Sequence, residues 1–421
     1  MDFFGFLNDS VTPCHTVGCL RDALVQAGFK RLGEEECAKT GAGDAFFVER
    51  DSALVAVRMP KKLCAESRFR LVLAHVDFPA LKVSPNPDKT VAGVQKLHAE
   101  VYGSPLYTSW LDRDLGYAGI LAVKKDGRIE AKPFRGKKLF RIPQLAVHLN
   151  RGVNQDGLKV NPQTDFDVLW KQAGFGEQTF RDALARELAP GEELLDFDVQ
   201  FFDAQPANAG GMDDEWVYSG RIDNLTSCHA VAEAIIGTKT PEKDIVVAAF
   251  FNNEEVGSET REGAGGNFLK AVLEEINASH IAHAGGSLSS LASRLSSSFA
   301  LSVDVAHATH PNSPEKHEPN HAPVLGGGVV LKTNSQNRYA GDVLSAARLR
   351  DLCASAGVAL QDFVMRNDMP CGSTVGPTVS AMLGIPTVDI GEPILSMHSI
   401  REMMAIKDHE SMIRLVSAFF C

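Results

Sequence analysis

The chain has 421 residues, of which 44% are hydrophobic and 23% are charged. This length allows two domains, or one domain with a large insertion, and the composition is that of an ordinary globular protein. The formal net charge of −11 at pH 7 argues against general nucleic-acid binding, because that function needs a basic surface. No run of 18 apolar residues occurs, so the sequence predicts no membrane-spanning helix and no membrane partner.

The N-terminal residues MDFFGFLNDS lack the basic segment of a secretory signal. The eight cysteines are scattered along the chain and form no CxxC pair. In a chain of this length, these features predict reduced thiols in a cytoplasmic protein. They argue against a disulfide framework and against a zinc–thiolate site.

The first part of the chain predicts helices followed by buried strands. A pair of amphipathic helices is expected over residues 3–29, with a break near Pro13. Alternating apolar residues at 46–57 predict a hairpin. The apolar run 69–74 predicts a buried strand that ends in the motif HVD.

Residues 83–215 have a different pattern, with short β-like segments, many turns and few long helical periods. Predicted strands are 101–107, 120–123, 129–133 and 199–202. A helix is expected at 180–188 and a polar loop at 154–165. Because this section contains none of the carboxylate motifs described below, we predict an inserted, mainly β domain. Residues 1–82 and 216–421 then form one discontinuous domain.

From residue 216 onward, predicted helices and strands alternate. The predicted strands are 245–251, 299–303, 329–331, 361–365 and 387–390. The predicted helices are 225–236, 267–276, 340–356, 373–383 and 400–419. The Ser-rich segment 285–298 is expected to be a mobile helix or loop. This alternation predicts a doubly wound α/β domain with helices on both faces of its sheet.

The stretch FFNNEEVG, residues 250–257, follows the predicted strand 245–251. Seven apolar residues without alternation indicate a strand buried on both faces, and ligands bind at the C-terminal edge of such sheets. Two adjacent carboxylates, Glu254 and Glu255, cannot point the same way. One can therefore bind a metal while the other acts as a general base. For this pair alone, a solvated acidic loop is the alternative.

Further imidazole and carboxylate groups stand directly after predicted strands or in turns. They are His75 with Asp77, Asp223, Asp304 and His398. Two histidines and three carboxylates suit two divalent ions about 3.5–4 Å apart that share a bridging carboxylate and an attacking water. Each residue alone has a structural alternative, since Asp223 could be a helix N-cap, Asp304 a turn residue and His398 a core histidine.

Six motifs occur in order along the chain. They are HVD (75–77), SGRIDN (219–224), NNEEVGS (252–258), SVDVAHATHPN (302–312), MPCGSTVGP (369–377) and SMHSIRE (396–402). Together they resemble the aspartyl aminopeptidase family of two-metal aminopeptidases. The similarity runs the length of the chain, including the position of the large insertion. It implies a doubly wound catalytic domain with a mixed sheet, interrupted by a mainly β dimerisation domain.

The resemblance implies a role for each matching residue. The implied metal ligands are His75, Asp223, Glu255, Asp304 and His398. Asp223 would be the bridging ligand, Asp77 would orient the first histidine, and Glu254 would be the general base. The implied cofactors are two divalent ions per subunit, with zinc favoured and cobalt or manganese as alternatives.

The same resemblance, together with charge, implies the substrate pocket. Lys332 matches the position that meets an acidic N-terminal side chain, although a surface lysine is the alternative. Backbone and hydroxyl groups of Gly372, Ser373 and Thr374 could line the same pocket. His148 matches a histidine that the inserted domain delivers to the neighbouring subunit, where it would help to polarise the scissile carbonyl. Without the resemblance, His148 suggests a partly buried strand histidine.

Four other histidines occur near these motifs. His307 and His310 are expected to be framework residues of SVDVAHATHPN. His317 and His321 are expected to lie in a loop near the site without binding metal.

The predicted function is a two-metal aminopeptidase that removes N-terminal residues, preferentially Asp or Glu, from peptides. One alternative is a related aminopeptidase that prefers neutral or hydrophobic residues. Another is a non-catalytic assembly protein with a vestigial site. The resemblance further implies dimers formed through the inserted domain and a tetrahedral dodecamer. The acidic net charge predicts no nucleic-acid partner.

Overall fold

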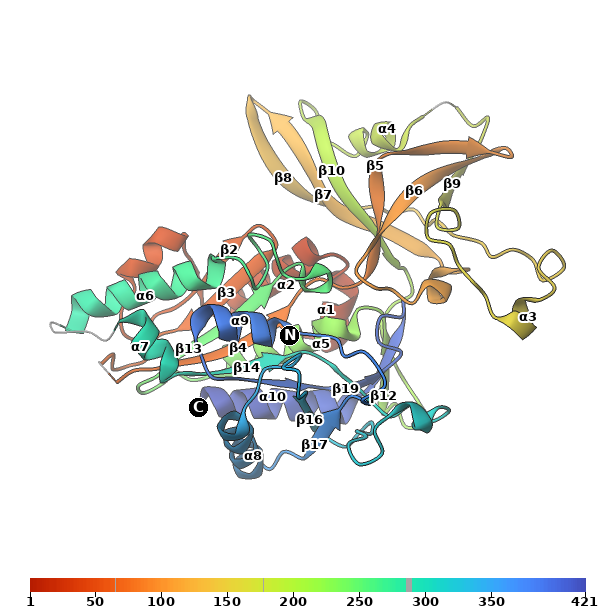
Figure 1. The fold of residues 1–421 in the computed structure, drawn as a ribbon. Helices are drawn as coiled ribbons and strands as arrows, with labels where there is room; N and C mark the ends of the chain where they lie inside the picture. Colours follow the sequence, from red (N-terminus) through yellow and green to blue (C-terminus); the bar gives the residue numbers. More distant parts are fainter. Residues whose placement is uncertain (65, 177, 285–289) are drawn as a thin grey trace.

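The computed structural model describes residues 1–64, 66–176, 178–284 and 290–421. Within these residues the chain forms three β-sheets and several flanking helices (Figure 1). The predicted mixed α/β fold is confirmed. Of the Ser-rich segment 285–298, residues 285–289 lie outside the described part, and the remainder contains the short helix α7 (Leu291–Ser296). Over the described ranges, no helix combines the length and apolar character needed to cross a membrane.

The largest sheet has nine strands in the order β1-β2-β3-β13-β4-β14-β18-β16-β17. Its strands are β1 (Lys30–Arg31), β2 (Ala45–Arg50), β3 (Ala53–Arg58), β4 (Phe69–His75), β13 (Ile245–Phe251), β14 (Phe299–Val303), β16 (Val329–Thr333), β17 (Leu360–Val364) and β18 (Thr387–Gly391). The central strands β13, β4, β14 and β18 are parallel, whereas β3 and β16 pair antiparallel with β13 and β18. The carboxyl ends of four strands therefore meet at one edge.

Helices cover both faces of this sheet (Figure 1). One face packs against α1 (Phe3–Asp9), α2 (Pro13–Gln26), α5 (Ile222–Gly237), α8 (Val343–Ala356) and α10 (Ile406–Phe420). The other packs against the 3₁₀ helix η1 (Glu34–Lys39), α6 (Phe268–Ala284), α7 and α9 (Val375–Leu383). Along β13, Ala248 and Phe250 belong to the first core, whereas Val247 and Ala249 belong to the second. This alternation explains why the strand is apolar at every position.

A second sheet stands to one side of the first and has the order β8-β7-β10-β5-β6-β9 (Figure 1). Its strands are β5 (Ala80–Val91), β6 (Val94–Tyr102), β7 (Leu115–Lys125), β8 (Arg128–Arg135), β9 (Val168–Gln172) and β10 (Glu193–Asp203). With it lie η2 (Tyr107–Trp110), α3 (Val153–Asp156) and α4 (Phe180–Ala185). Aromatic rings such as Tyr117, Phe140 and Phe180 build a separate core.

The third sheet is small and has the order β11-β12-β20-β19-β15. Its strands are β11 (Asn208–Gly210), β12 (Trp216–Ser219), β15 (Ala306–His307), β19 (Pro393–Leu395) and β20 (Glu402–Ala405). Two further 3₁₀ helices are η3 (Glu254–Val256) and η4 (Pro314–Lys316). The predicted division into an inserted domain, residues 83–215, and a discontinuous domain, residues 1–82 and 216–421, stays a proposal.

Several predicted elements differ from the observed ones in extent. The helix expected at 267–276 continues to Ala284, the strand expected at 199–202 begins at Glu193, and the loop expected at 154–165 begins within α3. Two further differences lie close to the cavity described below. The strand expected at 101–107 ends at Tyr102, because Gly103 turns the chain at φ +70° and Pro105 has no N–H to donate. The terminal helix expected from residue 400 begins at Ile406. The residues before it, β20, pair instead with β12 and β19.

Candidate active site

The described structure has a cavity of about 660 Å³ at the carboxyl edge of the central strands. The strands β4, β13 and β14 bring His75, Glu255 and Asp304 to this edge. Asp223 comes from the start of α5, and His398 from the turn before β20. All five side chains predicted to bind metal therefore line one cavity.

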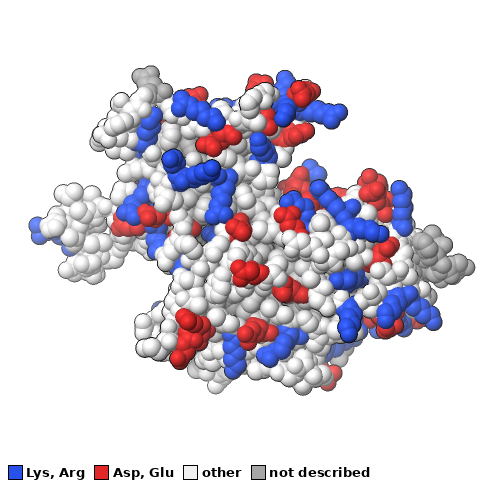
Figure 2. Space-filling view, turned by 180° about the vertical axis from the view of Figure 1, so that it is seen from behind, with Lys and Arg blue, Asp and Glu red and all other residues white. Residues whose placement is uncertain are grey.

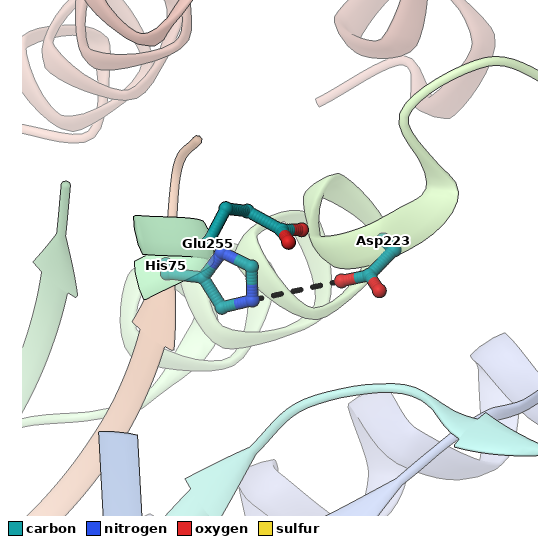
Figure 3. Close-up of side chains that lie close together, drawn as sticks. All are labelled: His75, Asp223 and Glu255. Carbon is teal, nitrogen blue, oxygen red and sulfur yellow. Dashed lines mark ion pairs between the residues drawn. The ribbon is translucent and has the colours of Figure 1, made fainter. Parts of the chain in front are cut away.

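Asp223 lies between the two histidines. Its Oδ1 is 3.5 Å from Nε2 of His75, and its Oδ2 is 3.4 Å from Nε2 of His398. Oε2 of Glu255 is 3.5 Å from Nε2 of His398, and Oδ1 of Asp304 is 3.9 Å from Nε2 of His75. Figure 3 shows His75, Asp223 and Glu255 directed toward a common point. A carboxylate with one oxygen toward each histidine has the arrangement of a bridging ligand.

These side chains fit a divalent cation. One potential ligand atom from each of His75, Asp223 and Glu255 lies within 4.8 Å of the other two. Oδ1 of Asp223 and Oε1 of Glu255 are buried and find no hydrogen-bond partner among the described residues. Buried carboxylate oxygens without partners are costly, and a bound cation would satisfy them. The mixed imidazole and carboxylate set is one that zinc accepts.

The pKa values of two side chains in the cavity also indicate an excess of negative charge. Burial raises the pKa of Glu254 to about 8, against the opposing effect of His75. Burial alone would lower the pKa of His398, but Asp223 and Glu255 raise it to about 10. The buried site thus favours protons on Glu254 and His398, and a metal cation would oppose both of them.

Asp77 connects the first histidine to the segment that carries Glu254 and Glu255. Nδ1 of His75 is 3.1 Å from the backbone oxygen of Asp77 and 3.4 Å from its Oδ1. The Asp77 carboxylate also accepts the backbone N–H groups of Glu254 at 3.0 Å and Glu255 at 3.1 Å. One fully buried carboxylate therefore fixes the His75 ring and the start of η3.

The second histidine is held in a similar way. Nδ1 of His398 is 2.9 Å from the backbone oxygen of Ser104, so that Nε2 faces the cavity. Glu402 is buried and accepts the backbone N–H groups of Asp223 at 3.0 Å and His398 at 2.7 Å. Glu402 closes the motif SMHSIRE but is not among the predicted site residues. A charged residue at the start of an otherwise apolar strand was the available signal.

Lys332 lies on β16 with only 2% of its surface exposed, so the surface-lysine alternative is wrong. Its ammonium group donates a hydrogen bond to the backbone oxygen of Val305 at 3.1 Å and is 3.7 Å from Oδ2 of Asp304. The ammonium group also lies 5.1 Å from the ring centre of Tyr339, which lines the cavity and is not among the predicted site residues. A buried cation beside the carboxylate cluster is suited to meet an anionic substrate group.

Gly372, Ser373 and Thr374 all line the cavity. The hydroxyl groups of the last two face other partners, however. Ser373 donates to the backbone oxygen of Arg338 at 3.1 Å, and Thr374 donates to Oδ1 of Asp389 at 2.8 Å. Backbone groups are thus the part of this segment that remains available to a substrate.

The remaining histidines are placed differently. His307 lines the cavity, and burial lowers its pKa to about 4. His310, His317 and His321 are not among the residues lining the described cavity, and His317 and His321 bond to neighbours in their own loop. His148 lies in an exposed turn rather than in a partly buried strand, so that expectation is wrong. The turn belongs to the segment between β8 and α3.

The family model described as "Aminopeptidase I zinc metalloprotease (M18)" matches residues 6–420. The chain belongs to the M18 family. The predicted family resemblance is confirmed, as is the predicted class of enzyme, a metallo-aminopeptidase.

This M18 aminopeptidase is similar to curated proteins over almost its full length. A probable M18 family aminopeptidase 2 from Pseudomonas aeruginosa is 40% identical over 424 residues, which cover 99% of this chain and 96% of the relative. The protein of the same name from Stutzerimonas stutzeri is 39% identical, with the same coverage.

Solved structures show the same fold. A chain in the cryo-EM structure of the Ape4 and Nbr1 complex has a TM-score of 0.93 and 33% identity, covering 100% of this chain and 84% of that chain. The S. cerevisiae mApe1 dodecamer has a TM-score of 0.84 and 28% identity, with coverage of 100% and 95%. An M18 aminopeptidase from Thermotoga maritima has a TM-score of 0.85 at 23% identity, with coverage of 100% and 95%, and supports the fold alone.

Proposed function

We propose that this M18 aminopeptidase removes N-terminal residues from peptides with two divalent metal ions per subunit, zinc being favoured, and that it prefers Asp and Glu. The placement of Asp223 between His75 and His398 carries the two-ion part of this proposal. The burial of Lys332 in the same cavity carries the acidic preference.

The site residues divide into two groups around Asp223. His75 and Asp304 would hold one ion with Asp223, whereas His398 and Glu255 would hold the other. When bound, such ions supply Lewis acidity and lower the pKa of water.

Glu254 would take the proton from the attacking water and return it to the leaving amine. Glu254 lines the same cavity as the candidate metal ligands, which supports its assignment as the base. Asp77 would orient His75 and hold the N–H group of Glu254, so that the base stays at a fixed position.

Lys332 would pair with the side-chain carboxylate of the N-terminal residue. A charge-assisted hydrogen bond in a buried site is stronger than a neutral one. One observation favours the alternative preference for neutral residues: Asp304 already lies 3.7 Å from the ammonium group and shares its charge. The neutral-preferring enzyme therefore stays the second candidate.

The exposed position of His148 supports a role outside its own cavity. Leu145 and Leu149, in the same segment between β8 and α3, are 62% and 74% exposed. In the view from behind, the lobe that extends to the left carries few charged side chains (Figure 2). We propose that this segment between β8 and α3 contacts a second subunit, and that the resulting dimers assemble into a tetrahedral dodecamer. A solved relative is itself described as a dodecamer. A cytoplasmic location belongs to the same proposal, because all eight cysteines are unpaired.

The proposal is tested with aspartyl-, glutamyl-, leucyl- and lysyl-p-nitroanilide. Each substrate is assayed after chelation and again after addition of zinc, cobalt or manganese. Metal-restored cleavage that favours the acidic substrates is expected. Restored cleavage that favours leucyl or lysyl substrates would retain the metal site and reject the acidic pocket. No cleavage under any metal would reject the proposed reaction.

A further inference from the structure

On one side of the candidate metal site, a residue of the second sheet makes two hydrogen bonds to residues next to the candidate ligands. Tyr102 ends β6, and its hydroxyl group donates a hydrogen bond to Oδ2 of Asp77 at 2.7 Å. The same hydroxyl group accepts a hydrogen bond from Nδ2 of Asn253 at 3.0 Å. Tyr102 thus contacts the carboxylate that orients His75 and the residue directly before Glu254.

The residues that follow Tyr102 contact the opposite side of the cavity. The backbone oxygen of Ser104 faces Nδ1 of His398 at 2.9 Å, and the N–H of Leu106 donates to the backbone oxygen of His398 at 2.8 Å. Gly103, between Tyr102 and Ser104, adopts φ +70°, and a Cβ atom there would lie 3.1 Å from Cβ of Glu255. Glycine at this position therefore lets the chain pass close to a candidate metal ligand.

We propose that Tyr102 is a positioning residue of this aminopeptidase and that residues 102–104 complete the metal site from the inserted sheet. The inference rests on the proposed metal site and goes beyond it. The groups that orient both histidines would then depend on one short segment outside the nine-stranded sheet. Correct packing of the inserted sheet would be a condition for tight metal binding.

The hydrogen-bond inventory of Asp77 shows why the tyrosine hydroxyl matters. Oδ1 accepts the N–H of Glu254, whereas Oδ2 accepts both the N–H of Glu255 and the hydroxyl of Tyr102. Asp77 is fully buried, so water cannot readily replace a lost donor. Without the hydroxyl group, the carboxylate loses one of its fixed contacts and His75 is oriented less firmly.

The test is Tyr102→Phe, which removes only the hydroxyl group. Zinc affinity is measured by competition with a chromogenic chelator, and kcat and KM are measured separately with the preferred anilide. We expect zinc affinity to fall by about 10–100-fold, the usual effect of losing a group that supports a metal ligand. We expect kcat to fall as well, with little change in KM. A purely structural role would lower thermal stability without moving zinc affinity.

Tyr107→Phe is the matched control. Tyr107 belongs to the same inserted unit and packs edge-on against Phe166, with 5.1 Å between the ring centres. It is not among the described hydrogen-bond partners of Asp77. It is expected to keep wild-type zinc affinity and kcat. Wild-type values in Tyr102→Phe would overturn the inference, as would an equal loss in both variants.

A second variant covers the case in which Tyr102→Phe does not fold. Asn253→Gly removes the other partner of the tyrosine hydroxyl and keeps the positive φ of +62° at this position. Asn253→Gly is expected to lower zinc affinity by a smaller factor than Tyr102→Phe. Unchanged zinc affinity would overturn the inference. Failure of the wild-type protein to bind zinc would instead overturn the proposed function.

Discussion

Glu254 is the side chain on which the proposed reaction depends at the scale of single residues. It lies in the cavity beside the candidate ligands, and its backbone N–H is held by Asp77. The motif NNEEVGS presents two glutamates without distinguishing them. Oε2 of Glu255 lies 3.5 Å from Nε2 of His398, and this distance supports the proposal that Glu255 binds metal.

Glu254→Gln is expected to retain zinc and to lose turnover by about 10²–10⁴-fold, because glutamine cannot accept and return a proton. The measurements are kcat on the preferred anilide and zinc per subunit by elemental analysis. Glu259→Gln is the control, since Glu259 is exposed and does not line the described cavity. Near-wild-type turnover in zinc-loaded Glu254→Gln would reject the base assignment.

At the scale of elements, helices α5 and α10 meet through a buried polar contact rather than through apolar packing alone. Nδ1 of His229 on α5 lies 2.9 Å from Nε2 of His409 on α10, and His409 pairs with Glu392 at 2.7 Å. Burial, followed by His409 and the N-terminal amine of Met1, lowers the pKa of His229 to about 3. His229 is therefore neutral in the folded protein.

This contact predicts how stability changes with pH. The unfolded chain binds a proton at His229 below pH 6.5, whereas the folded chain does so only near pH 3. The contribution of neutral His229 to the free energy of unfolding is thus complete above pH 6.5 and is lost as the pH falls. By pH 5 the loss from His229 should be about 2 kcal/mol.

The comparison uses urea unfolding of wild type and His229→Asn at pH 7 and pH 5. Asparagine does not titrate. Between pH 7 and pH 5, the free energy of unfolding of His229→Asn should therefore fall by about 2 kcal/mol less than that of wild type. His310→Asn is the control, because His310 is exposed. An identical pH dependence in wild type and His229→Asn would contradict the prediction.

At the scale of the whole molecule, the exposed turn that carries His148 is not part of the described lining of its own chain's cavity. Leu145 and Leu149, close to His148 in the chain, are exposed, and such apolar side chains suit a contact with a second copy. If His148 acts in the neighbouring subunit, catalysis requires two chains.

Subunit complementation tests this prediction. His148→Ala alone should lower kcat by about 10²–10³-fold if it removes a group that stabilises the developing oxyanion. Mixed with Glu254→Gln, it should form dimers in which one site combines an intact Glu254 with the other chain's His148. Random mixing should restore roughly a quarter of wild-type activity, because half of the dimers are mixed and each has one complete site.

Subunit exchange is confirmed separately with labelled chains, since an unmixed sample would also remain inactive. Mixed dimers that stay as inactive as their components would contradict action in the neighbouring subunit. Full activity of His148→Ala alone would show that the histidine is dispensable.

The local pattern of residues determined much of this protein. The apolar runs predicted β13 and β14 with their observed bounds, because strands buried on both faces need apolar side chains at every position. The polar residues after those strands predicted which side chains would meet, since parallel strands end at a common edge. The ordered motifs predicted the M18 family, which the comparisons confirm.

Tertiary structure decided the contacts between residues far apart in the chain. The backbone oxygen of Ser104 reaches His398 across 294 residues, and Tyr102 reaches Asp77 from a different sheet. The burial of Lys332, the exposure of His148 and the late start of α10 likewise depend on which segments pack against them. Local patterns encode the direction and polarity of an element, whereas its neighbours are fixed only when the sheets and helices assemble.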